Sequence, residues 1–272
     1  MVVARLRAAG CVFAEEEAAI LGASAGTPAE LGLMVARRAG GEPIEQVVGW
    51  AEFAGRRVLV DPGVFVPRRR SEFLVEVALA LAQAGPPGVV ADLCCGTGAL
   101  GLVVTAGLRL RGADLYAADL DPAAVACARK NVGPAGGHVY AGDLFSALPD
   151  SLRGRISVLI CNAPYVPTTE IAFMPAEARD HEALMALDGG ADGLAILRRV
   201  AAGAGAWLAP GGVLLVETSE RQAASMAAVM AAGGLAGRVH EDDESGATVV
   251  TGVAASGPAR SRTEDGGSLG VL

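Results

Sequence analysis

The stretch "GVVADLCCGTGALGLVVTAG", residues 88–107, joins a short apolar run to a longer apolar run through a turn rich in glycine. The first run is apolar apart from Asp92, which is typical of a strand buried on both faces of a parallel sheet. Gly96, Gly98 and Gly101 allow the backbone to bend tightly and to approach another group closely. The stretch therefore predicts a strand, a glycine turn and a helix that begin an α/β sheet.

The same alternation continues along the chain. The runs are "ADLYAADL" with "DPAAVACARKN", then "HVYAGDL", "RISVLIC", and "GGVLLVET" with "SERQAASMAAVMAAGG". Apolar strands that alternate with helices predict a doubly wound, mainly parallel α/β sheet with helices on both faces. A last run, "ATVVTGVA" at 247–254, is a further strand candidate, with an expected antiparallel partner near 238–241.

The N-terminal region carries a different pattern. Residues 1–50 contain two runs, 11–22 and 28–41, with apolar residues three and four apart and a terminal glycine, which predicts a small helical domain. Residues 51–70 contain apolar runs around the turn residues 61–63 and predict a hairpin or linker.

The main domain is expected to span residues 71–254. It opens with a predicted helix over 71–85, with the Ser71 hydroxyl as the N-cap. The remaining residues, 255–272, are polar and rich in glycine, so we expect a disordered tail.

Composition and charge limit the classes of function. The 272 residues carry a formal net charge of -8, which argues against salt-driven binding to nucleic acid over a broad surface. We find neither an apolar stretch long enough for a membrane span nor an export signal. Five cysteines at uneven spacing match no disulfide or zinc pattern. We expect a cytoplasmic protein without membrane or direct nucleic-acid partners.

Polar residues close the strand candidates of the sheet. They are Asp92, Asp119, Asp143, Asn162 and Glu217. In an open α/β sheet, ligands bind beyond the carboxyl ends of the strands. These side chains are therefore expected to meet around one ligand.

The first two strand ends indicate a nucleoside cofactor. Gly96, Gly98 and Gly101 match the pattern GxGxxG, and Asp119 lies 21 residues after Gly98, where a carboxylate accepts hydrogen bonds from a ribose diol. A nicotinamide dinucleotide and S-adenosylmethionine both fit this spacing. Asp92, four residues before Gly96, would repel a pyrophosphate but suits a cationic amino-acid group, which favours S-adenosylmethionine.

The third strand end extends this hypothesis to adenine. Asp143 is suited to accept the exocyclic N–H of adenine while the backbone N–H of Leu144 donates to the ring. The structural alternative for Asp143 is a helix N-cap, and one residue can fill both roles.

Other reactive side chains have structural interpretations. Cys94 and Cys95 are interpreted as packing residues, because adjacent residues of a strand point to opposite faces. The three histidines show no ligand spacing. Asp180 and His181 are the pair to examine for substrate contact, although a structural role in a loop is favoured.

The loop "CNAPYVP", residues 161–167, completes a resemblance to a known family. The other matching segments are "GEPIEQVVGWAEFAG", "VFVPRRRSEFLVE", "DLCCGTGALG", "AADLDPAAVACARKN", "GDLFSAL" and "EARDHEALMALDGGADGLAILRRV". Over about residues 42–253 the chain resembles the HemK-type protein N5-glutamine methyltransferases, which methylate a glutamine side-chain amide in peptide chain release factors. The resemblance implies a seven-stranded Rossmann-like fold, S-adenosylmethionine as cofactor, S-adenosylhomocysteine as product and a release factor as protein partner.

The resemblance also implies roles for individual residues. The Asp92 strand end and the glycine turn would line the methionine end of the cofactor, Asp119 the ribose, and Asp143 with Leu144 the adenine. The implied cofactor-binding residues are Phe65, Pro67, Arg68, Asp92, Cys94, Gly96, Thr97, Gly98, Asp119, Leu120, Asp143, Leu144 and Asn162, and the implied catalytic residues are Asn162, Ala163, Pro164 and Tyr165.

Four positions depart from the pattern of the family. Ala163 stands in place of a proline, Cys94 in place of a frequent glycine, and Arg69 and Arg70 in place of proline and glutamate. Pro164 still favours an extended backbone at Ala163, so the Ala163 carbonyl can point at a substrate. With the short helical domain, these departures are compatible with a paralogue that has another target.

The expected reaction is methyl transfer to an amide nitrogen. The Asn162 side-chain oxygen and the Ala163 carbonyl would accept from the NH2 group and aim its nitrogen, while Tyr165 stacks on the amide or walls the pocket. No base is placed, so proton loss would follow transfer. The alternatives are methylation of another amide or exocyclic amine on a nucleobase or small molecule, an NAD-dependent oxidoreductase, and a catalytically inactive paralogue.

Overall fold

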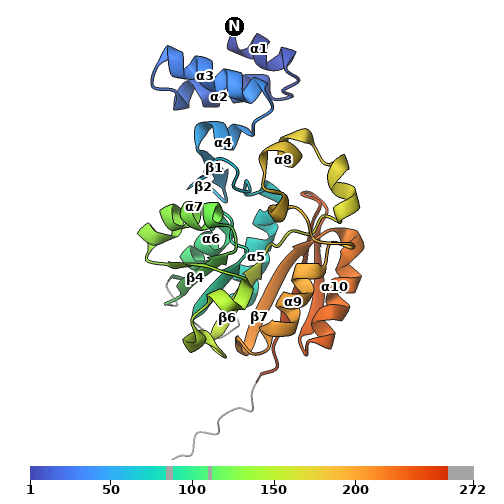
Figure 1. The fold of residues 1–272 in the computed structure, drawn as a ribbon. Coiled ribbons are helices and arrows are strands. Elements are labelled where there is room, and N and C mark those ends of the chain that lie inside the picture. The colour runs from blue at the N-terminus through green and yellow to red at the C-terminus, as the bar shows by residue number, and fades with distance from the viewer. Residues whose placement is uncertain (84–87, 110–111, 257–272) are drawn as a thin grey trace, which may run out of the picture.

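The computed structural model describes residues 1–83, 88–109 and 112–256, and its main feature is a seven-stranded sheet (Figure 1). The strand order is β5-β4-β3-β6-β7-β9-β8. The strands are β3 (Val89–Leu93), β4 (Asp114–Asp119), β5 (His138–Ala141), β6 (Ile156–Cys161), β7 (Leu208–Thr218), β8 (Ala236–Asp242) and β9 (Ala247–Val253). The first five in this order pair in parallel, and β9 pairs antiparallel with β7 and β8. The predicted α/β class, the mainly parallel sheet and the antiparallel last pair are confirmed.

Helices cover both faces of the sheet, because its central strands are apolar on both faces (Figure 1). The helices are α5 (Glu72–Ala82), α6 (Ala99–Gly107), α7 (Pro122–Val132), α9 (Ala195–Ala204) and α10 (Glu220–Ala232). Ile160 of β6 shares one core with Val104 of α6, and its neighbour Leu159 shares the other core with Leu197 of α9. The strand order reverses between β3 and β6, so a ligand is expected beyond their carboxyl ends.

Short helices at the N-terminus form a separate small core. They are α1 (Val2–Ala8), α2 (Ala14–Ser24), α3 (Pro28–Ala39) and α4 (Ile44–Val48). Leu6, Leu21 and Val35 are buried in this core, which lies beyond one end of the sheet in Figure 1. The helices predicted within 11–22 and 28–41 are present as α2 and α3. Helix α1 was not predicted, because seven residues are too few to establish a helical period.

A two-stranded hairpin follows, formed by β1 (Trp50–Phe53) and β2 (Arg56–Leu59). Its turn is made by Ala54 and Gly55, whose φ angles are 48° and 69°. Positive φ at both central residues is the geometry of a type I′ turn, which matches the twist of the flanking strands. The predicted hairpin is therefore present, but its turn lies at 54–55 and not at 61–63. Ala-Gly lacks the usual turn composition, so the sequence did not indicate this turn.

The start of α5 also differs from prediction. Ser71 makes no side-chain cap hydrogen bond. Its φ and ψ of -70° and -7° are already helical, whereas a capping residue has extended backbone. The Ser71 hydroxyl instead donates to the carboxylate of Glu217.

Some predictions concern residues outside those that the structure describes. The predicted disorder of the tail lies outside the described residues from 257 onward, as do positions 84–85 of the predicted helix. In the part of the chain that the structure describes, no helix is both long enough and apolar enough to cross a membrane.

Candidate active site

A pocket lies beyond the carboxyl ends of β3, β4 and β6, where the strand order reverses. All the residues to which the family resemblance gave a role line this pocket except Asp92 and Gly98, and Glu217, predicted from its place at a strand end, does not line it either. Those that line it are Phe65, Pro67, Arg68, Cys94, Gly96, Thr97, Asp119, Leu120, Asp143, Leu144, Asn162, Ala163, Pro164 and Tyr165. The fold therefore brings together residues that are up to 100 positions apart, from Phe65 to Tyr165.

The glycine turn after β3 has an unusual backbone. Cys94, Gly96 and Gly98 have φ angles of 55°, 53° and 78°. A Cβ atom at Gly98 would lie 2.7 Å from the Val132 side chain, so Gly98 permits close packing against α7 and does not face the pocket. The Gly96 N–H donates to Asp119 Oδ2 at 2.8 Å, which joins the turn to the end of β4.

Asp92 lies beneath this turn and not on the pocket wall. It is 1% exposed, and its Oδ2 accepts the Gly101 N–H at 2.9 Å. Its Oδ1 is buried and has no hydrogen-bond partner among the described residues. Burial raises the pKa of Asp92 to about 7, against the opposing effect of the Gly101 hydrogen bond. The direct contact with a cofactor that was expected of Asp92 is not supported by this position.

Asp119 closes β4 at the pocket wall, as the sequence predicted. Its Oδ2 is held by the Gly96 N–H and its Oδ1 by the Asp121 N–H at 2.9 Å. Burial raises the pKa of this carboxyl group, and the backbone hydrogen bonds oppose that effect. Each carboxylate oxygen has a second lone pair, so Asp119 can still accept from a diol. Leu120 beside it is 56% exposed.

Asp143 and Leu144 follow β5. The Asp143 carboxylate forms an ion pair with Arg199 at 2.6 Å and makes no side-chain cap, so the N-cap alternative is wrong. Leu144 has a φ angle of 50°, in the left-handed region that few residues with side chains adopt. Cys94 shares this strained conformation, and both residues line the same pocket. Such strain concentrates at ligand sites.

Asn162 follows β6 directly, and its side-chain amide nitrogen donates two hydrogen bonds. Nδ2 donates to Ser71 Oγ at 3.3 Å and to Glu217 Oε2 at 3.4 Å. Within the described residues no donor is bonded to Asn162 Oδ1 or to the Ala163 carbonyl oxygen. Two hydrogen-bond acceptors in succession are therefore available at the pocket wall.

The backbone of this loop is fixed by the segment before α9. A Cβ atom at Gly189 would lie 2.7 Å from the Pro164 carbonyl oxygen, and one at Gly193 would lie 2.2 Å from the Tyr165 carbonyl oxygen. Gln222 of α10 donates to that same Tyr165 oxygen at 2.9 Å. Only glycine fits at these two positions, which accounts for the sequence "DGGADG" there.

Two comparisons with known proteins bear on this pocket. A family model described as a methyltransferase small domain matches residues 55–191. A release factor glutamine methyltransferase of Geobacter sulfurreducens is 34% identical over 221 residues, which cover 80% of this chain and 75% of that protein. The chain belongs to the HemK-type methyltransferase family.

Membership of the HemK-type family decides between the two cofactor hypotheses. The protein is an S-adenosylmethionine-dependent methyltransferase, and S-adenosylhomocysteine is the product left by its cofactor. The NAD-dependent alternative is thereby set aside. The residues present fit this cofactor, because a glycine turn with left-handed backbone and the carboxylate of Asp119 share one pocket wall.

Two further known proteins are similar to this chain, one in sequence and one in fold. A 4-amino-L-phenylalanine/4-methylamino-L-phenylalanine methyltransferase of Streptomyces pristinaespiralis is 36% identical over 205 residues, which cover 74% of this chain and 69% of that protein. The crystal structure of a methyltransferase from Pyrococcus furiosus matches with a TM-score of 0.51 and 11% identity, over 73% of this chain and 89% of that chain, and shows the shared fold.

The departures from the HemK-type pattern now have structural contexts. Cys94 has the left-handed backbone that glycine adopts without strain. Ala163 is 2% exposed and packs in the sheet core. Arg69 and Arg70 are both exposed, and Arg70 lines the pocket with its Nε 3.0 Å from Glu217 Oε1.

Sequence reasoning missed the buried carboxylate of Glu182. Its Oε1 accepts from the Val66 N–H at 3.1 Å and from Arg68 Nη2 at 2.6 Å. Arg68 in turn lies 4.9 Å from the Phe65 ring centroid. Glu182 therefore holds the Phe65–Arg68 strip against the pocket, and no local pattern in the sequence indicates this role.

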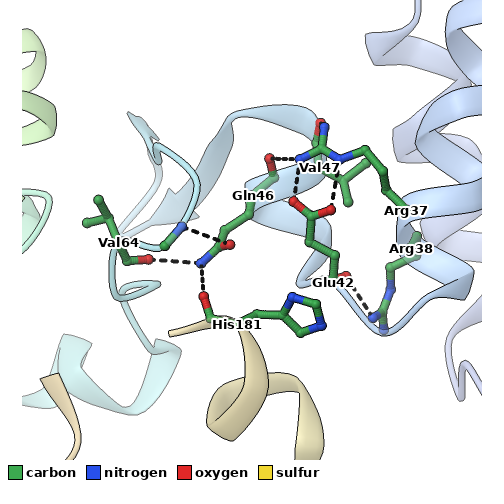
Figure 2. Close-up of polar contacts among 8 residues, drawn as sticks. Arg37, Arg38, Glu42, Gln46, Val47, Val64 and His181 are labelled. Atoms are coloured by element: carbon green, nitrogen blue, oxygen red, sulfur yellow. Dashed lines mark hydrogen bonds and ion pairs between the residues drawn. The ribbon is translucent and has the colours of Figure 1, made fainter. Parts of the chain in front are cut away.

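The neighbouring pair, Asp180 and His181, does not line the pocket. Asp180 pairs with Arg179, and the His181 carbonyl accepts from the Gln46 side chain at 3.4 Å. Figure 2 shows Gln46 between this carbonyl and that of Val64, at the base of the N-terminal helices. The pair lies in the helix α8 (Ala176–His181) and not in a loop, and His181 ties this helix to the N-terminal region.

Proposed function

We propose that this enzyme methylates the side-chain amide nitrogen of a glutamine, in the Gly-Gly-Gln motif of a peptide chain release factor. The observation that carries the proposal is the arrangement of Asn162 and Ala163. Because Ser71 and Glu217 hold the Asn162 nitrogen, its oxygen and the Ala163 carbonyl remain to accept both hydrogens of a substrate NH2 group. The names of relatives such as the Geobacter sulfurreducens protein support the same target.

These two acceptors address the main difficulty of the reaction. An amide nitrogen is a poor nucleophile, because its lone pair is shared with its carbonyl group. S-adenosylmethionine supplies a methyl group activated by a sulfonium centre. Acceptors on both N–H bonds orient the amide plane and stabilise positive charge that develops on nitrogen. Orientation of this kind lowers a barrier by about 7–11 kcal/mol at most.

Tyr165 forms part of the wall and does not act as a base. Its hydroxyl donates to Glu217 Oε1 at 2.9 Å and accepts from Arg70. Burial, followed by the charge of Glu217, raises the pKa of the phenol well above its usual range. None of the three histidines, all within the described residues, lines the pocket. The amide proton therefore leaves after methyl transfer, to solvent.

The test uses S-adenosylmethionine labelled in its methyl group and purified release factors. A release factor with an intact Gly-Gly-Gln motif is expected to take up label on glutamine, and one with that glutamine replaced is not. Label that persists after the replacement would refute this target. The target also implies a cytoplasmic enzyme, because release factors act on ribosomes.

A second candidate is methylation of a small aromatic amine. It is favoured by the relative from Streptomyces pristinaespiralis, whose similarity is comparable and whose name gives a free amino acid as substrate. The pair of acceptors suits any NH2 group, and the exposed guanidinium of Arg70 at the pocket keeps N–H groups for a substrate carboxylate beyond those it donates to Glu217 and Tyr165. Competition between 4-amino-L-phenylalanine and the release factor in one labelled assay distinguishes the two candidates.

A further inference from the structure

The acceptor site is the part of the pocket at Asn162 and Ala163 where the methyl-accepting NH2 group would bind. Glu217 is a buried carboxylate that contacts four side chains in or beside this site. It lies near the end of β7 and is 2% exposed. Its Oε2 accepts from Ser71 Oγ and from Asn162 Nδ2 at 3.4 Å. Its Oε1 accepts from Arg70 Nε at 3.0 Å and from the Tyr165 hydroxyl at 2.9 Å. All four neighbouring side chains are hydrogen-bond donors, so each oxygen of the carboxylate accepts two hydrogen bonds.

This arrangement fixes which end of the Asn162 amide faces the pocket. An asparagine side chain presents a donor at one end and an acceptor at the other, and a flip of about 180° exchanges them. In the flipped state Asn162 Oδ1 would face the Glu217 carboxylate and the oxygen of Ser71, whose only hydrogen is given to that carboxylate. Asn162 Oδ1 would then face two oxygens with no hydrogen left to donate to it, which is unfavourable in a buried site.

We propose that Glu217 is the positioning residue of the acceptor site: its carboxylate directs Asn162 Oδ1 into the pocket and holds the Tyr165 hydroxyl. Glu217 does not itself line the pocket, so it acts through these two side chains. The inference rests on the proposed function, in which Asn162 Oδ1 accepts a substrate N–H. It predicts that the site binds substrate groups whose nitrogen donates two N–H hydrogen bonds. It also predicts that substrates with an oxygen nucleophile, which cannot donate two such bonds, are not methylated.

The charge of Glu217 is accommodated by its surroundings. Arg70 is its ionic partner, and Ser71 and Tyr165 complete its hydrogen bonds. A buried carboxylate is tolerated only when it is paired in this way. Ser71 and Arg70 lie at the start of α5, so the turn that precedes this helix supplies part of the acceptor site.

Glu217→Gln tests the inference, because it keeps the shape and replaces one acceptor oxygen by a donor. We expect kcat for methyl transfer to fall at least about tenfold, and no further than in Asn162→Ala, where loss of one preorganised group costs about 10²–10³-fold. The dissociation constant of S-adenosylmethionine should change little. Glu220→Gln is the matched control, since Glu220 is exposed on α10 three residues later.

The double variant separates positioning from a general structural effect. If Glu217 acts through Asn162, Glu217→Gln adds less than about twofold in the Asn162→Ala background. An equal loss in both backgrounds, or no loss in the wild type, overturns the inference. A wild type that labels neither release factor nor 4-amino-L-phenylalanine instead refutes the proposed function.

One measurement needs no acceptor at all. The Asn162 NH2 resonances in a proton–nitrogen spectrum are identified by their absence in Asn162→Ala. They should shift strongly in Glu217→Gln and stay in place in Glu220→Gln. Resonances that do not move in Glu217→Gln contradict the proposed contact, whatever the activity of the enzyme.

Discussion

The two sides of the pocket are held together over very different distances in the sequence. The turn side consists of the turn after β3 and residues 119–121, with Asp92 beneath them. Here Gly101 bonds to Asp92 nine residues away, and Gly96 bonds to Asp119 23 residues away. The loop side consists of residues 162–166 and Ser71, supported by Glu217 from beneath the pocket, and here Asn162 bonds to a side chain 91 residues away. Ser71 and Glu217 are 146 residues apart.

The kinds of contact also differ. On the turn side, backbone N–H groups donate hydrogen bonds to carboxylates, and glycine permits the backbone conformation that places these groups. The loop side is held by side chains from several elements that meet on one buried carboxylate. We expect changes on the turn side to affect stability and cofactor binding, and changes on the loop side to affect methyl transfer.

The largest expected effect is on the loop side. Asn162→Ala should lower kcat for methyl transfer about 10²–10³-fold, because one preorganised acceptor is lost. The dissociation constant of S-adenosylmethionine, measured by calorimetry, should change much less. Asp119→Asn is the contrasting variant on the turn side, and it should weaken cofactor binding more than it slows transfer. Equal losses of binding and transfer in both variants would remove the distinction between the two sides.

The next effect concerns the support of the loop. Gly193→Ala places a Cβ atom 2.2 Å from the Tyr165 carbonyl oxygen at a φ angle of 75°. We expect the free energy of unfolding in urea to fall by about 3 kcal/mol, from left-handed strain and overpacking together.

Gly246→Ala is the matched control for this substitution. Its φ angle is 66°, but no atom lies within 4 Å of the added Cβ. It should cost only the strain of the left-handed conformation, about 1 kcal/mol. Similar losses in the two variants would show that the contacts of the added Cβ with Tyr165 and Gln222 contribute nothing.

The pH dependence of stability tests the buried acid of the turn side. Between an ordinary pKa of 3.8 and the folded value of about 7, folded Asp92 keeps a proton that the unfolded chain has released. The free energy of unfolding therefore falls as the pH rises through this range, by up to about 1.4 kcal/mol per pH unit, and levels off above it.

Asp92→Asn removes this titration. Urea unfolding of both proteins from pH 4.5 to 8 should show the wild type losing stability relative to the variant as the pH rises. A difference that is independent of pH would mean that Asp92 is ionised in the folded protein.

The smallest effect is a gain. Cys94→Gly relieves a φ angle of 55°, and the strain of about 1–2 kcal/mol exceeds the entropic cost of glycine by up to about 1 kcal/mol. We expect the free energy of unfolding to rise by that amount. Leu144→Gly relieves a similar strain but removes a buried side chain, so it should destabilise. Destabilisation by Cys94→Gly would show that the packing of the thiol outweighs the strain.

The sequence by itself determined the order of strands and helices and the polar residues that close the strands. Apolar runs with a period of two or of about four are local properties, and the carboxyl ends of parallel strands meet whatever the details of packing. Asp119, Asp143 and Asn162 were placed at the pocket for this reason, and the GxGxxG spacing located the turn.

Only the tertiary structure decided how these residues are used. Ser71 has the composition of a cap, but its helical backbone and the nearness of Glu217 make it a donor to the acceptor site. Asp92 matches its expected strand, but packing of Gly101 against it buries the carboxyl group below the pocket. Such contacts depend on segments that meet only when the sheet is assembled, so no local pattern of the sequence predicts their energies.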